Sequence, residues 1–132
     1  MKVFSFSVFV AGATALGINC RGSILCESSA PFAMLNVQDQ LNDMINAGNG
    51  SRWFNEHEQI VCSKGQIDSV CVFFQKGASG TAQDALTHVQ NLLNHGCSTC
   101  GSDPTQDGND VSTGELTVNA VSDACCVGSC QC

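Results

Sequence analysis

The stretch Asn91–Ser122, NLLNHGCSTCGSDPTQDGNDVSTGELTVNAVS, joins a helix end, two cysteines, a polar loop and an alternating segment. His95 can place a cation at the helix C-terminus, and Gly96 suits the left-handed residue that commonly follows a helix. The turn-rich residues up to Gly114 predict a loop, and the alternation over residues 115–121 predicts a half-buried strand. The rest of the chain has to fold onto this helix and this strand.

The segment upstream of this stretch gives the clearest helix signal. Thr81 is a suitable N-cap, and Asp84 stands three residues later, as in a capping box. One apolar stripe follows: Ala82, Ala85, Leu86, Val89, Leu92 and Leu93. Burial of this stripe against a sheet would form the core.

The remaining elements come from weaker patterns. A helix is expected over residues 31–47, with Ser29 as N-cap and Pro31 in its first turn. Its apolar face would consist of Met34, Val37, Leu41, Met44 and Ile45. Strands are expected over residues 59–62 and 67–75, because both are rich in β-branched or aromatic residues and Gly65 marks a turn between them.

The loop after the first expected helix contains Asn49-Gly50-Ser51, an N-glycosylation sequon. An exposed loop would tolerate a sugar on Asn49. The same residues also read as a plain turn, so both interpretations stay open.

The chain begins with a secretory signal pattern: Met1-Lys2, an apolar run and the small residues Ala13-Thr14-Ala15. We therefore expect residues 1–15 to be a signal peptide. Residues 16–132 would form a single domain with a cysteine-rich C-terminal tail. No other apolar run approaches the ~20 residues of a membrane helix, so we expect a secreted, extracellular protein without membrane insertion.

Charge narrows the possible partners. Lys2 lies in the expected signal peptide, so residues 16–132 contain four basic and twelve acidic residues. Four minus twelve gives a net charge of −8. Nucleic acid and anionic lipid need positive surface, so neither is an expected partner. We expect a monomer.

Cysteine is the most informative residue type in this composition. A small secreted chain uses its cysteines as a disulfide framework. The ten cysteines are Cys20, Cys26, Cys62, Cys71, Cys97, Cys100, Cys125, Cys126, Cys130 and Cys132. Ten cysteines allow about 945 pairings, so spacing alone does not give the connectivity.

Several motifs carry a resemblance to a known family. NHGC, CGSDP, GNDVS and LTVN in the C-terminal half, and LGINCRGS with Cys26 near the start, resemble the killer-protein-four-like family of killer toxins, known from corn smut. Trp53 and the pair Val61-Cys62 align in the middle. The resemblance implies an α+β fold, an α/β sandwich in which two helices pack on one face of a disulfide-stapled antiparallel sheet.

The resemblance also implies disulfide pairs. Cys20 would pair with Cys97, Cys26 with Cys100, and Cys62 with Cys125 or Cys126. Cys71 and the tail cysteines have no counterpart in the family and would form replacement bridges.

Spacing adds one expectation for the tail. Cys130 and Cys132 stand too close to bridge each other comfortably, so each is expected to bridge outward, one of them to Cys71.

Three patterns suggest other chemistry. Cys97-Ser98-Thr99-Cys100 has redox spacing, but a fully oxidised secreted chain favours structural bridges, and a zinc site lacks a second ligand pair. The histidines His57, His88 and His95 are expected to be surface or capping side chains. A small secreted hydrolase that uses His57 or His95 is a further alternative, yet no nucleophile or carboxylate motif accompanies them. The loop from Asp103 resembles a calcium loop but has Gly114 where the bidentate glutamate belongs. We therefore expect no catalytic residue, metal or cofactor.

The function implied by the resemblance is growth inhibition of competing or host cells through block of calcium channels. A family lysine implicated in activity falls at Ile60 in this chain. Lys64 and Arg52 are the cations nearest to that segment, so Lys64, Arg52 and Ile60 are the candidate target-binding residues. The partner would be a membrane protein of a target cell. The alternative is a secreted virulence effector of the same fold that binds a host surface protein.

Overall fold

The computed structural model describes residues 16–27 and 31–132. The predicted signal peptide and Ser29 lie outside the described residues. In chain order the elements are η1 (Ile24–Cys26), α1 (Ala33–Asn46), β1 (Trp53–Phe54), β2 (Val61–Ser63), β3 (Ser69–Gln75), β4 (Gly80–Thr81), α2 (Ala82–Asn94), β5 (Gly101–Pro104), η2 (Val111–Thr113), β6 (Glu115–Val121) and β7 (Cys130–Gln131).

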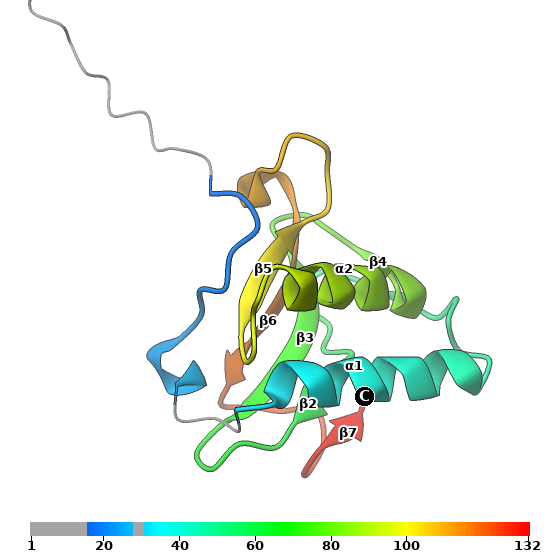
Figure 1. The fold of residues 1–132 in the computed structure, drawn as a ribbon. Coiled ribbons are helices and arrows are strands. Elements are labelled where there is room, and N and C mark those ends of the chain that lie inside the picture. Colours follow the sequence, from blue (N-terminus) through cyan, green and yellow to red (C-terminus); the bar gives the residue numbers. More distant parts are fainter. Residues whose placement is uncertain (1–15, 28–30) are drawn as a thin grey trace, which may run out of the picture.

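The main sheet has five strands in the order β5-β6-β3-β2-β7, and every neighbouring pair is antiparallel. Strands β1 and β4 form a separate two-stranded ribbon. Helices α1 and α2 pack on each other and on the same side of the main sheet (Figure 1). The α+β fold, with two helices on one face of an antiparallel sheet, is therefore confirmed.

Local signals explain helix α2. The Thr81 hydroxyl accepts a hydrogen bond from the Asp84 amide at 3.1 Å, and the Asp84 carboxylate accepts one from the Thr81 amide at 2.9 Å. Gly96 takes a φ of +96°, the left-handed conformation that ends a helix. Both ends of this helix were predicted from sequence and are confirmed.

Helix α1 is shorter than the expected 31–47. It begins at Ala33 after Phe32, whose side chain makes no capping hydrogen bond. The amide of Met34 instead donates to the carbonyl of Ser98 at 3.1 Å, so the loop after α2 satisfies part of the first turn. A long-range contact of this kind leaves no trace in local sequence.

The core lies between the helices and the helix-facing side of β3 and β6. Val70, Val72 and Phe74 alternate along β3 and are almost completely buried, as the predicted strand face requires. Helical side chains fill the opposite layer: Met34, Val37, Leu41, Met44, Ala82, Ala85, Leu86, Val89 and Leu92. At roughly 1.5 to 3 kcal/mol for each large apolar side chain, this layer is a main source of stability.

Strand β5 lies inside the segment that the sequence predicted as a loop. It pairs with β6 so that Ser102 stands opposite Thr117, and their hydroxyls lie 3.0 Å apart. Gly, Ser, Asp and Pro are depleted in strands, so the composition gave no strand signal. The loop prediction is wrong for residues 101–104.

The other strand boundaries also shift. The predicted 59–62 strand is β2, Val61–Ser63, and the predicted 67–75 strand is β3, Ser69–Gln75. Both segments were located correctly, and each strand begins two residues later than predicted.

The N-terminal segment covers part of β5, and the C-terminal β7 forms the opposite edge of the main sheet. Asn19 exchanges two backbone hydrogen bonds with Ser102 on the outer side of β5, at 3.0 and 2.9 Å. On the other side, β7 pairs with β2 through Val61–Gln131 and Cys62–Cys130.

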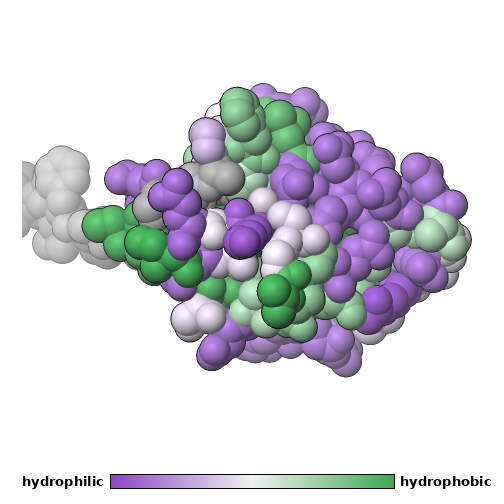
Figure 2. All heavy atoms as spheres, turned by 90° about the horizontal axis from the view of Figure 1, so that it is seen from below, coloured by the Kyte–Doolittle hydropathy of each residue, from purple (hydrophilic) through white to green (hydrophobic). Residues whose placement is uncertain are grey.

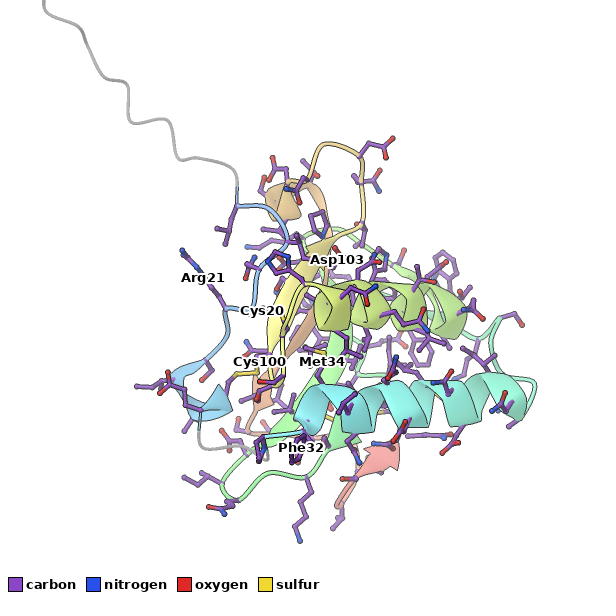
Figure 3. All side chains as sticks on the ribbon, viewed as in Figure 1. Cys20, Arg21, Phe32, Met34, Cys100 and Asp103 are labelled. Atoms are coloured by element: carbon purple, nitrogen blue, oxygen red, sulfur yellow. A yellow bond between two sulfur atoms is a disulfide. The ribbon has the colours of Figure 1, made fainter. Side chains whose placement is uncertain are left out.

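The two bridges at the N-terminal segment match the expectation. Cys20 pairs with Cys97, and Cys26 pairs with Cys100. Figure 3 shows Cys20 and Cys100 between the N-terminal segment and β5. These bridges fasten the start of the chain to the end of α2 and to β5.

The other expected pairs are wrong. Cys62 pairs with Cys71, its direct neighbour across β2 and β3, rather than with Cys125 or Cys126. The tail pairs internally, through Cys125–Cys132 and Cys126–Cys130, so neither Cys130 nor Cys132 reaches Cys71. Cross-strand adjacency and the tight fold of the tail, which sequence spacing does not reveal, bring these pairs together.

Candidate functional site

Lys64 follows directly after β2, at the base of the β2–β3 loop, residues 64–68 with the sequence KGQID. The loop projects from the end of the sheet (Figure 1). The Lys64 side chain is exposed, while its amide donates to the Ser129 hydroxyl at 3.0 Å. Ile67 in the same loop is 71% exposed. This loop therefore presents one cation and one apolar side chain to solvent.

Arg52 lies in a different part of the fold, directly before β1. Its guanidinium carbon is 4.8 Å from the centre of the Phe54 ring, a cation–π contact. Its carbonyl accepts a hydrogen bond from the Ala82 amide at 3.0 Å. The two candidate cations thus flank strands of different sheets. Arg52 contacts Phe54, and the Lys64 backbone contacts Ser129.

Ile60 has no exposed surface. Its amide donates to the Val72 carbonyl at 2.8 Å, and its carbonyl accepts from the Cys132 amide at 2.9 Å. Because the side chain is part of the core, it presents nothing to a target. The buried position of Ile60 therefore corrects the expectation that its side chain takes part in target binding.

The acidic segment before Ile60 is a structured turn. Glu56 accepts a hydrogen bond from the Gly77 amide at 2.5 Å, and Glu58 accepts one from the Asn55 side chain at 2.8 Å. His57 takes a φ of +68° and is exposed. These contacts tie the turn to the β3–β4 connection.

No sequence pattern predicted a pairing between His88 and Asp103. His88 Nδ1 lies 2.6 Å from Asp103 Oδ2, and the Asn91 side chain donates to the same oxygen at 2.9 Å. Asp103 is 6% exposed. In Figure 3 Asp103 lies beside α2, the helix that contains His88 and Asn91. The partners come from a helix and from a strand that the sequence predicted as a loop, so no motif could join them.

A hollow of about 330 Å³ lies next to this pair. It is lined by Phe74, Gly77, Ala78, Ser79, Asp84, His88, Thr105 and Gln106. An aspartate that orients a histidine is one part of a hydrolytic triad. Ser79 and Thr105 contribute hydroxyls to the lining, but no hydrogen bond joins either hydroxyl to His88 within the described residues. The contact with Asp103 therefore links α2 to β5.

The cysteines of the redox-like motif and the aspartates of the calcium-like loop make structural contacts. Cys97 and Cys100 are each bonded to an N-terminal cysteine. Asp103 of the calcium-like loop is held by His88, and Asp110 accepts hydrogen bonds from the amide and the hydroxyl of Ser112 at 2.9 and 2.6 Å. The Ser112 hydroxyl and amide lower the pKa of Asp110 below its ordinary value. Asp110 is thus the N-cap of η2 in an Asx turn.

Asn49 stands exposed in the turn after α1, where its amide donates to the Met44 carbonyl at 2.9 Å. The position is accessible to a glycosylating enzyme. Glycosylation of Asn49 stays a prediction.

Four sulfur atoms gather where the tail meets β2. Those of Cys62, Cys125, Cys126 and Cys132 all lie within 4.8 Å of one another. Each belongs to a disulfide, and a disulfide sulfur lacks the charge of a thiolate ligand. The sulfur cluster is therefore a crossing point of three bridges.

Polar residues cover much of one face of the molecule. Figure 2 shows one face on which hydrophobic residues stand in separate small groups among hydrophilic ones. Within the described part of the chain, no helix has both the length and the apolar character needed to cross a membrane.

Comparison with known proteins places this chain in a family. The sequence profile of the Kp4 family matches residues 3–122, so residues 123–132 lie beyond the match. The chain is 46% identical over 109 residues to the KP4 killer toxin of Ustilago maydis P4 virus, and the alignment covers 80% of each chain. With this extent of identity, this chain belongs to the Kp4 family.

Proposed function

We propose that this protein is a secreted toxin that inhibits the growth of competing or host cells by binding a target on their surface. The observation that carries the proposal is the 46% identity to a killer toxin over 80% of both chains. Five disulfides in one small chain support export, because such bridges persist in oxidising compartments.

The mode of action we propose is block of a calcium channel, without catalysis. The acidic rings of cation-channel pores attract a positive side chain, and a rigid protein can present one at low entropic cost. Lys64 meets this need, since it is exposed at the base of a hairpin loop and its backbone is held by the tail. Ile67 adds an apolar contact beside it. We propose that the protein acts as a monomer on a membrane protein of the target cell.

Lys64→Glu tests this mechanism. The substitution reverses one charge on an exposed side chain, so the fold should persist. If Lys64 is a central contact, the loss of about 1 to 3 kcal/mol of binding free energy should lower potency by roughly 5- to 150-fold. Calcium uptake and growth of fungal and plant cells are measured with purified wild-type and variant proteins.

Lys76→Glu is the matched control. Lys76 is also exposed, lies in the β3–β4 connection, and undergoes the same change in charge. We expect it to keep most of the activity. Equal loss in both variants would point to overall charge rather than to a contact at Lys64. Growth inhibition with unaltered calcium uptake would refute channel block and favour an effector that binds another surface protein.

A further inference from the structure

The sequon Asn49-Gly50-Ser51 lies in the turn that joins α1 to β1. It is the only sequon in this sequence, because no other asparagine has serine or threonine two positions later. The side chains of Asn49 and Ser51 are both exposed. The two side chains that a glycosylating enzyme recognises are therefore on the surface.

The backbone of this turn is held, whereas its sequon side chains are free. The Arg52 amide donates to the Asn49 carbonyl at 3.1 Å. The Gln83 amide donates to the Gly50 carbonyl at 2.9 Å, which ties the turn to the start of α2. Among the described residues, the side chains of Asn49 and Ser51 have no hydrogen-bond partner. A sugar on Asn49 therefore displaces no hydrogen bond of the fold.

Trp53 stands beside the same turn, and its side chain is 57% exposed. The hydrogen bond between Arg52 and Asn49 closes the turn, so the Cα atoms of these two residues lie within about 7 Å of each other. Trp53 is the next residue. Its indole N–H donates to the Asn55 side chain at 3.2 Å, which orients the ring. A large apolar side chain thus lies within reach of a group attached to Asn49.

We propose that Asn49 carries an N-linked glycan and that the first sugars of this glycan cover Trp53. The side-chain nitrogen of Asn49 attacks the anomeric carbon of an oligosaccharide that is carried on a lipid diphosphate. The nitrogen loses one proton, and the lipid diphosphate leaves. The apolar faces of the first sugars then remove the indole ring from water. This inference rests on the export that we propose above, because such glycans are added in the secretory pathway.

The glycan lies far from the loop that contains Lys64. Figure 1 shows the turn after α1 and the β2–β3 loop at opposite ends of α1. This helix has 14 residues and is about 21 Å long at the usual rise per residue. A glycan on Asn49 hinders the approach of a large target to Arg52 and leaves Lys64 free. Of the two candidate cations, the glycan therefore favours Lys64 as the target contact.

Intact mass tests the modification. The full chain, including residues 1–15, is expressed in a yeast, and the protein is purified from the medium. Its mass is measured before and after treatment with peptide N-glycosidase. We expect the enzyme to remove two N-acetylglucosamine units and several mannoses. Secreted protein that loses no mass would overturn the glycan alone, whereas protein that stays inside the cell would overturn export and the glycan together.

Ser51→Ala and Ser51→Thr form a matched pair of variants. Both leave Asn49 in place and change one exposed side chain that has no hydrogen-bond partner in the described part of the chain. Ser51→Ala destroys the sequon and should abolish the loss of mass, whereas Ser51→Thr keeps the sequon and should retain it. A sugar on Ser51→Ala, or its absence from Ser51→Thr, would contradict attachment at Asn49.

The fluorescence of Trp53 tests the cover directly, because the chain has no other tryptophan. Quenching by acrylamide is measured for the secreted protein, the glycosidase-treated protein and the two variants. We expect the quenching constant to rise in the treated protein and in Ser51→Ala, the two samples without sugar. In Ser51→Thr it should stay at the value of the untreated protein. One common constant for all four samples would overturn the cover of Trp53.

Discussion

Ile60 and Ile67 are seven residues apart in the chain but lie in opposite environments. Ile60 has no exposed surface, and Ile67 is 71% exposed at the loop tip. The sequence patterns around them predict which segments are strands and which are turns. They do not predict which of the two isoleucines faces the core. That choice depends on the packing of β2 against α1, a contact between segments far apart in the chain.

This contrast gives a prediction at the residue scale. Ile60→Lys buries an ammonium group in the core, and we expect it to lower the free energy of unfolding by about 3 kcal/mol or more. Ile67→Lys makes the same chemical change in solvent and should cost no more than about 0.5 kcal/mol. Urea denaturation of both variants checks this, and equal stability would mean that Ile60 is not in the core.

At the scale of elements, α2 and β5 are joined by a polar contact as well as by packing. The buried carboxylate of Asp103 on β5 meets His88 and Asn91 on α2. A buried polar group without a partner costs about 1 to 3 kcal/mol. The pair therefore fixes how the helix sits on the edge of the sheet.

Asp103→Ala should consequently destabilise the protein by about 1 to 3 kcal/mol, since it leaves two side chains without their acceptor. Asp107→Ala, in the exposed loop that follows, loses the same carboxylate and should cost no more than about 0.5 kcal/mol. Thermal unfolding measured by circular dichroism distinguishes the two. Similar melting temperatures would argue against the His88–Asp103 contact.

The same two elements show what sequence can predict. Helix α2 is specified by local sequence: the Thr81–Asp84 capping box, the apolar stripe and Gly96. Its boundaries were therefore predicted correctly. Strand β5 is made of residues that disfavour strands, and it exists because β6 and the N-terminal segment pair with its two sides. The Asp103 contact and the β7 pairing depend on such long-range register, which is why sequence missed them.

At the scale of the whole molecule, the five disulfides divide into two kinds. Cys20–Cys97 and Cys26–Cys100 close loops with sequence separations of 77 and 74. The other three are local, with separations of 9, 7 and 4. The resemblance implied both long bridges correctly, because their cysteines lie in the motifs that carry it. Among the cysteines of the local bridges, Cys62 aligns with the family, but its partner Cys71 has no counterpart there.

The length of the loop that each bridge closes predicts that the two kinds of bridge contribute unequally to the free energy of unfolding. In the chain-entropy description, a bridge across about 77 residues stabilises by about 4.5 kcal/mol, and one across about 4 residues by about 2 kcal/mol. Replacing Cys20 and Cys97 with serine should therefore lower the free energy of unfolding by roughly twice as much as replacing Cys126 and Cys130. The Cys20–Cys97 bridge also holds the segment that covers the outer side of β5, so its loss should raise hydrogen exchange at Ser102. Denaturation in guanidinium, with hydrogen exchange followed residue by residue, measures both effects. If the tail bridge proved the more stabilising of the two, stability would depend on the local packing of the tail rather than on the long loops.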